Sequence, residues 1–169
     1  MIFPRFTVIL LAAILAIPSL ARAQNNNVTP DYLAVSMGWY DVNMQKNESA
    51  AFELLYRFGR PFFWKVKPFL GVMANSDLAL YAYGGLGLDL QLSDSWYFYP
   101  NVGVGAYSQG DSKDLGYGIE FHDSLELGYQ FENNARLGLS FTHMSNAGLG
   151  NKNPGTEILS VVYAIPFGR

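Results

Sequence analysis

Residues near the C-terminal end of the chain have the types and spacing needed for acyl transfer. His143 and Ser145 stand two positions apart, and Glu157 follows after a loop. A serine hydroxyl attacks an ester carbonyl when a histidine takes its proton and returns it to the leaving alcohol. A carboxylate that bonds the imidazole holds its tautomer and stabilises its positive charge. These three residues therefore predict a serine esterase.

The oxyanion formed in such a reaction needs hydrogen-bond donors. The backbone N–H groups of Ala147 and Gly148 and the side-chain amide of Asn153 lie in the loop between Ser145 and Glu157. A His-x-Ser pair also fits a second interpretation, in which rim residues of a membrane protein bond headgroups or water. The fold that places these residues decides between the two.

The elements that position these residues are predicted to be strands, because apolar residues alternate along the whole chain after its first segment. Small, polar and tyrosine side chains occupy the positions in between. The alternating runs cover residues 33–39, 52–58, 66–72, 80–90, 96–104, 119–131, 135–141 and 159–167. This pattern predicts one all-β domain with eight antiparallel strands.

Periodicity alone leaves open which face of these strands is inside. A soluble lipocalin-like barrel turns its apolar face inward, whereas an outer-membrane barrel turns it to lipid and fills its lumen with the polar face. The runs are long enough to span a bilayer, aromatic residues cluster at their ends, and the last run reaches Phe167 near the C-terminus. We therefore predict an eight-stranded antiparallel transmembrane β-barrel of the bacterial outer membrane.

The composition agrees with a membrane location. Hydrophobic residues make up 50% of the 169 residues and charged residues only 15%, against about 25% in soluble domains. Residues 1–23 read as a secretory signal peptide that ends at Ala21-Arg22-Ala23, and residues 24–169 would form the barrel domain. The chain carries a net charge of −3 and no basic cluster, which argues against nucleic acid as a partner.

The strand count also predicts the topology. With both termini in the periplasm, residues 59–64, 93–95 and 132–134 form periplasmic turns, and residues 41–50, 75–77, 108–116 and 147–156 form outer loops. Short inner turns and longer outer loops are typical of such barrels. His143, Ser145 and Glu157 then lie on the lipid-facing side at outer-leaflet depth. We expect them to be the only polar residues out of place on that side.

The residues from His143 to Gly148, His-Met-Ser-Asn-Ala-Gly, are followed by Asn153 and Glu157 and by a strand that ends near Ile165-Pro166-Phe167. This stretch resembles the lipid A 3-O-deacylase family of the PagL type; elsewhere the resemblance is architectural. It implies an outer-membrane enzyme that hydrolyses the ester-linked 3-O acyl chain of lipid A and uses neither a metal nor a cofactor. Its implied partners are lipopolysaccharide as substrate and the surrounding outer-membrane lipids.

The resemblance also implies a role for each matching residue. His143 would be the base, Ser145 the nucleophile and Glu157 the acid that orients the histidine. Asn153 and the Gly148 amide would be the oxyanion donors.

Three alternatives to an esterase stay open at this point. The first is a non-catalytic small barrel that acts as an adhesin or membrane stabiliser, the second is an acyltransferase that moves a phospholipid chain onto lipid A, and the third is a soluble lipocalin-like carrier. In the esterase interpretation, with the catalytic residues on the outside of the barrel, the polar lumen is expected to be structural, with its residues pairing with one another. That lumen set comprises Glu53, Arg57, Glu120, His122, Glu126 and Arg136. The sequence makes no prediction of the oligomeric state.

Overall fold

The computed structural model describes residues 29–167, so the predicted signal peptide, residues 1–23, lies outside the described part. Between residues 29 and 167 the chain forms strands, joined by turns and loops. These strands are β1 (Asp31–Tyr40), β2 (Ser49–Arg57), β3 (Val66–Asn75), β4 (Leu80–Leu88), β5 (Leu90–Gln91), β6 (Trp96–Ser108), β7 (Ile119–Gln130), β8 (Arg136–Ser145) and β9 (Thr156–Phe167). Across the described residues, no helix is both long and apolar enough to cross a membrane.

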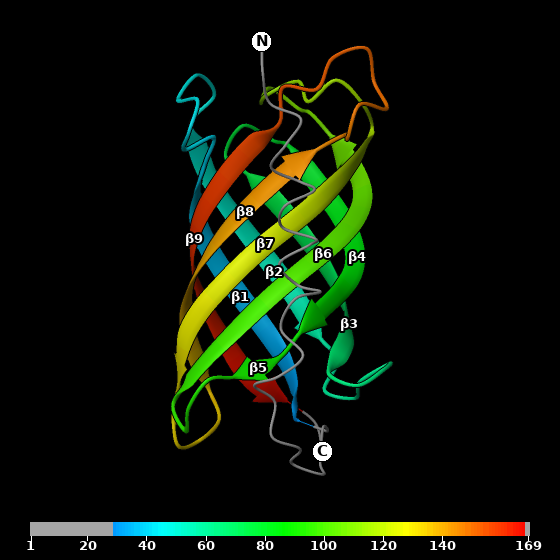
Figure 1. Ribbon diagram of the computed structural model, residues 1–169. Helices are drawn as coiled ribbons and strands as arrows, with labels where there is room; N and C mark the ends of the chain where they lie inside the picture. Colours follow the sequence, from blue (N-terminus) through cyan, green and yellow to red (C-terminus); the bar gives the residue numbers. More distant parts are fainter. Residues whose placement is uncertain (1–28, 168–169) are drawn as a thin grey trace.

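The strands form one antiparallel sheet that closes on itself as a tilted barrel (Figure 1). Neighbours along the chain pair with each other, except β4 and β5; β9 pairs with β1, and β4 pairs with β6. The short β5 continues β4 along the same edge of β6. Within the described residues the barrel is therefore eight-stranded, as the alternation predicted, with one strand interrupted at Asp89.

The outer wall of the barrel is apolar. Met37 and Leu139, in the middle of β1 and β8, leave 62% and 58% of their surface exposed, and most apolar positions of the other strands are exposed as well. A continuous apolar surface of this size is unstable in water and requires lipid around it. The structure thus confirms the membrane barrel and excludes the lipocalin-like alternative, in which these side chains would be buried.

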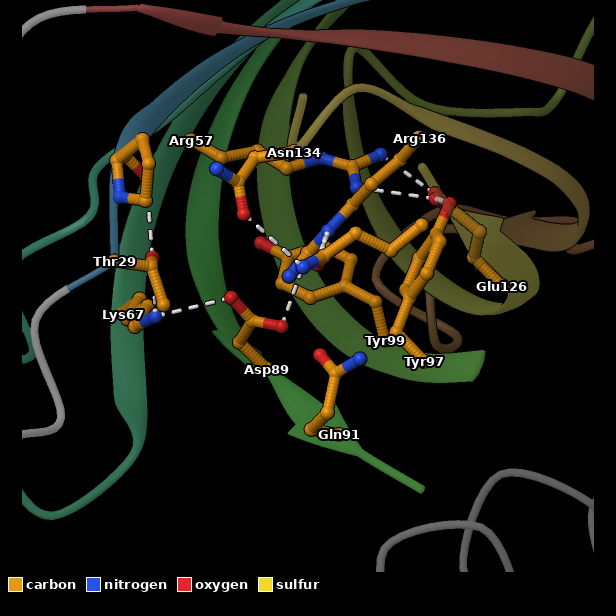
Figure 2. Close-up of polar contacts among 12 residues, drawn as sticks. Thr29, Arg57, Lys67, Asp89, Gln91, Tyr97, Tyr99, Glu126, Asn134 and Arg136 are labelled. Atoms are coloured by element: carbon orange, nitrogen blue, oxygen red, sulfur yellow. Dashed lines mark hydrogen bonds and ion pairs between the residues drawn. The ribbon is translucent and has the colours of Figure 1, made fainter. Parts of the chain in front are cut away.

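The lumen is filled by buried ion pairs at the end where the described chain begins and ends (Figure 2). Arg57 donates two hydrogen bonds to Glu126, at 2.5 and 3.1 Å. Asp89 forms ion pairs with Lys67 and Arg136, each with an N–O distance of 3.0 Å. Buried charges are costly unless they are paired, and each of these charged side chains lies beside one of opposite charge.

Further along the lumen, His122 Nε2 lies 2.9 Å from Asn101 Oδ1, and its ring stacks on Tyr83. Glu53 accepts hydrogen bonds from Tyr83 and Ser36. Of the six lumen residues expected to pair with one another, Arg57 and Glu126 do so, whereas Glu53, His122 and Arg136 bond other lumen side chains. Glu120 is the exception. Its two buried carboxylate oxygens have no hydrogen-bond partner among residues 29–167.

The two ends of the barrel differ in the length of their connections (Figure 1). The turns β2–β3, β5–β6 and β7–β8 lie at the end where β1 begins and β9 finishes. The longer β6–β7 and β8–β9 loops lie at the opposite end, next to the β1–β2 loop. This asymmetry identifies the second end as the extracellular one, and it is the end at which β8 finishes and β9 starts.

Candidate active site

His143 and Glu157 meet on the outer wall at the extracellular end of the barrel. β8 and β9 are adjacent and antiparallel, and their register places the two residues directly opposite each other. His143 Nδ1 lies 3.1 Å from Glu157 Oε1, with side-chain exposures of 32% and 17%. Because Nδ1 is bound to the carboxylate, Nε2 is the ring nitrogen that remains for a substrate or a nucleophile.

Ser145 lies at the end of β8, on the same face as His143. Its cross-strand partner is Phe121, whose side chain is exposed on the outer wall. Ser145 itself is 7% exposed, and within residues 29–167 no hydrogen bond joins it to His143. The structure therefore brings the predicted base and acid together but does not make the contact between base and nucleophile, a contact that often tightens only when substrate binds.

The loop after β8 is organised by Asn146, which is completely buried. Its backbone N–H donates to Asn153 Oδ1 at 3.0 Å, and its Oδ1 accepts the Gly148 N–H at 2.9 Å. Its Nδ2 donates to the carbonyl oxygens of Leu115 and Lys152. Asn146 thus joins the β8–β9 loop to the β6–β7 loop, a role that sequence reasoning did not assign to it.

These contacts bear on the two predicted oxyanion donors. Asn153 uses its carbonyl oxygen to accept the Asn146 N–H, so its NH₂ group points elsewhere and can donate. The Gly148 N–H is already engaged by Asn146. The left-handed backbone of Ala147 and Gly148, with φ of 52° and 85°, forms the tight turn that brings this amide back to Asn146. Of the two predicted donors, Asn153 is the available one.

Gly155 borders the His143 ring. Its φ of 62° lies in the left-handed region that favours glycine. A methyl group at this position would lie 3.0 Å from His143 Cε1 and 3.6 Å from Nε2. The loop backbone therefore passes close against the edge of the imidazole that carries its unbound nitrogen.

Asp123 is a further polar residue on the outer wall, and the expectation that only His143, Ser145 and Glu157 would be out of place there is wrong. β7 places Asp123 directly opposite His143, so it forms a row with His143 and Glu157 across three adjacent strands. The sequence signal was available, because Asp123 interrupts the alternation between Phe121 and Leu125.

Asp41, in the β1–β2 loop, is a second residue that sequence reasoning missed. It is completely buried. Burial disfavours its charged form, but hydrogen bonds from Lys113 and from the amides of Asn47 and Lys46 outweigh burial and hold the pKa of Asp41 below its ordinary value. No local pattern in the sequence distinguishes this carboxylate from an exposed loop aspartate.

Comparison with known proteins agrees with this architecture. The family described as "Lipid A 3-O-deacylase (PagL)" matches residues 31–166. The crystal structure of the outer membrane enzyme PagL aligns with a TM-score of 0.61 and 23% identity, covering 80% of this chain and 99% of that chain. A de novo designed transmembrane β-barrel aligns with a TM-score of 0.57 and 12% identity, covering 84% of this chain and 100% of the design. No curated protein matches.

The two structural likenesses support the barrel fold, and the family match adds to it a relationship along the sequence. That match begins with the first residue of β1, ends one residue before the end of β9, and includes every residue of the candidate site. Because it covers residues 31–166, most of the chain, the protein belongs to the PagL family of lipid A 3-O-deacylases.

Proposed function

We propose that this protein is a serine esterase that hydrolyses the ester-linked 3-O acyl chain of lipid A in the outer leaflet of the outer membrane. Family membership supports the reaction and the substrate. The observation that carries the proposal is the contact between His143 Nδ1 and Glu157 Oε1 on the lipid-facing wall. Polar groups facing lipid are costly and tend to be functional, so a bonded His–Glu pair at this depth favours a catalytic role.

In the proposed reaction the Ser145 hydroxyl attacks the ester carbonyl while His143 Nε2 takes its proton. Glu157 stays ionised and stabilises the imidazolium, and the Asn153 NH₂ group donates to the oxyanion. The tetrahedral intermediate collapses when the bond to the 3-oxygen of lipid A breaks and His143 returns its proton to that oxygen. A water molecule, deprotonated by His143, then attacks the acyl-serine carbonyl; the bond to Ser145 Oγ breaks, His143 returns the proton to Oγ, and the fatty acid is released.

The position of the site supports access from the membrane. The interior cavity lined by Glu53, His122 and Met144 has a volume of about 10 Å³, room for about one water molecule. An acyl chain cannot pass through such a lumen. The substrate would instead reach His143 and Ser145 by lateral diffusion in the outer leaflet, while water enters at headgroup level.

The test is mass spectrometry of lipid A from cells that express either the wild-type protein or Ser145→Ala. We expect the wild type to remove one hydroxyacyl group and Ser145→Ala to leave lipid A intact. Ser140→Ala is the matched control, because Ser140 lies on the same strand but is buried on the lumen face. It should retain activity.

The same spectra separate the alternatives. An acyltransferase would increase the mass of lipid A by one acyl chain. A non-catalytic barrel would leave lipid A unchanged in every strain. Either result, or full activity in Ser145→Ala, would contradict the proposal.

A further inference from the structure

Asp41 lies where β1 passes into the first outer loop, and its carboxylate joins three outer segments. Oδ2 accepts the backbone N–H groups of Lys46 and Asn47, at 3.2 and 3.0 Å, within its own loop. Oδ1 accepts Lys113 Nζ from the β6–β7 loop at 2.5 Å and Thr156 Oγ1 from the start of β9 at 3.2 Å. All of these contacts lie at the extracellular end of the barrel.

The β1–β2 loop makes two contacts with the start of β9, where Glu157 lies. Thr156 immediately precedes Glu157, and its hydroxyl bonds Asp41. The next residue of the loop, Val42, donates its backbone N–H to the Glu157 carbonyl oxygen at 3.1 Å. Successive side chains of a strand point to opposite faces. The Thr156 side chain therefore bonds Asp41 on the lumen side, while the Glu157 side chain points outward to His143.

Lys113 is itself fixed in place. Its carbonyl oxygen accepts the Tyr107 hydroxyl at 2.8 Å, and the Tyr107 hydroxyl lies 3.2 Å from that of Tyr40. The Lys113 and Asp41 side chains are 10% and 0% exposed. Removing either charge would leave the other buried without an opposite charge beside it, which destabilises the local arrangement.

We propose that Asp41 and Lys113 are positioning residues for catalysis. Their buried ion pair holds the 156–157 peptide so that the Glu157 carboxylate meets His143 Nδ1. Neither residue contacts the reacting atoms, and both act through Glu157. The inference rests on the proposed function, because it requires that Glu157 orient a catalytic histidine.

The test is a double-mutant cycle on the purified protein in detergent micelles, with 3-O-acylated lipid A as substrate. Asp41→Asn should lower kcat about tenfold or more with little change in KM, because small misplacements of a catalytic group are costly. In a Glu157→Gln background the same substitution should change the residual kcat less than about twofold, since the group it positions is already lost. An equal loss of kcat in both backgrounds, or no loss in the wild-type background, would overturn the proposal.

Two further variants keep the test decisive if Asp41→Asn does not fold. Thr156→Val removes only the hydroxyl contact and should reproduce the loss of kcat, and Thr156→Ser should restore it. The matched control is Asp114→Asn, which breaks the exposed Asp114–Lys152 ion pair at the same end of the barrel and should leave kcat unchanged. A loss of kcat in Thr156→Val that persists in the Glu157→Gln background would also overturn the proposal.

The measurement distinguishes this proposal from the proposed function. If Ser145→Ala kept the wild-type rate, the serine esterase itself would be wrong, whatever the cycle gave. If Ser145→Ala were inactive and the effects of Asp41→Asn and Glu157→Gln were additive, the esterase would stand and only the positioning role would fail.

Discussion

The imidazole of His143 is confined on two sides. Nδ1 is bonded to Glu157, and the loop backbone at Gly155 passes beside the Cε1–Nε2 edge of the ring. A histidine that serves as both base and acid must present Nε2 in a narrow range of directions. The loop backbone at Gly155 and the carboxylate of Glu157 together restrict the ring to such a range.

Gly155→Ala tests this confinement. The new methyl group would lie 3.0 Å from His143 Cε1, and the residue would have to keep a φ of 62°, so either the ring or the loop must move. We expect the rate of lipid A deacylation to fall about tenfold with the barrel still folded. Gly118→Ala is the control, since a methyl group there meets no atom within 4 Å. Equal rates for the two variants would show that Gly155 does not confine the ring.

Sequence periodicity was sufficient to place the His143–Glu157 pair, because strand parity and hairpin pairing determine which residues share a face. The same rule places Asp123 on the lipid-facing side, between Phe121 and Leu125. The engagement of the Gly148 N–H by Asn146 was not predictable, because it depends on the left-handed turn at residues 147 and 148. A loop conformation of this kind has no periodic signal.

At the scale of strands and loops, the contacts that organise the molecule join segments far apart in the sequence. The break between β4 and β5 falls at Asp89, whose side chain bonds Lys67 from β3 and Arg136 from β8. Alternation predicted one uninterrupted run over residues 80–90, since it carries no information on the partners of Asp89, one on the adjacent strand β3 and one on β8, which is not adjacent to β4 or β5. The long-range role of Asp41 was hidden for the same reason.

The Asp41 contacts make the packing of the outer loops depend on pH. Burial disfavours ionisation of this carboxyl, yet hydrogen bonds from Lys113, Asn47 and Lys46 keep its pKa below the ordinary value. A carboxyl whose pKa is lower in the folded state than in the unfolded state contributes stability above the unfolded-state pKa. That contribution is lost as the pH falls through the folded-state value. We therefore expect the outer loops to loosen below about pH 4.

Hydrogen exchange of residues 42–48, corrected for intrinsic rates, measures this effect. In the wild type, protection of the Lys46 and Asn47 amides should be high at neutral pH and fall in acid. In Asp41→Asn, which does not ionise, protection should be lower at neutral pH and change little on acidification. The same acid-dependent loss of protection in both proteins would assign the effect to another group.

For the molecule as a whole, the important property is which face of the sheet meets the surroundings. Alternation alone allowed either face to be inside. Strand length and the aromatic strand ends favoured the membrane barrel, and the exposure of the apolar face in the closed sheet confirms it. The inner face of the sheet is polar, and its paired charges allow the interior to be filled without an apolar core.

A charge in the middle of the lipid-facing wall tests this orientation. Leu139→Arg should lower the free energy of unfolding in phospholipid vesicles by about 2–4 kcal/mol, because the arginine would face the hydrocarbon region. Glu132→Arg, in the exposed β7–β8 turn, should have little effect. Denaturant titrations followed by tryptophan fluorescence give both values. Two equally stable variants would place Leu139 outside the hydrocarbon region.

The central claim is that a serine on the lipid-facing wall is the nucleophile, and covalent trapping tests it most directly. The purified protein is incubated with an alkyl fluorophosphonate, and the adduct is located by mass spectrometry. We predict one adduct, on Ser145, formed much more slowly in His143→Ala and absent in Ser145→Ala. An active enzyme that is not labelled, or that is labelled at another serine while Ser145→Ala still deacylates lipid A, would contradict this account.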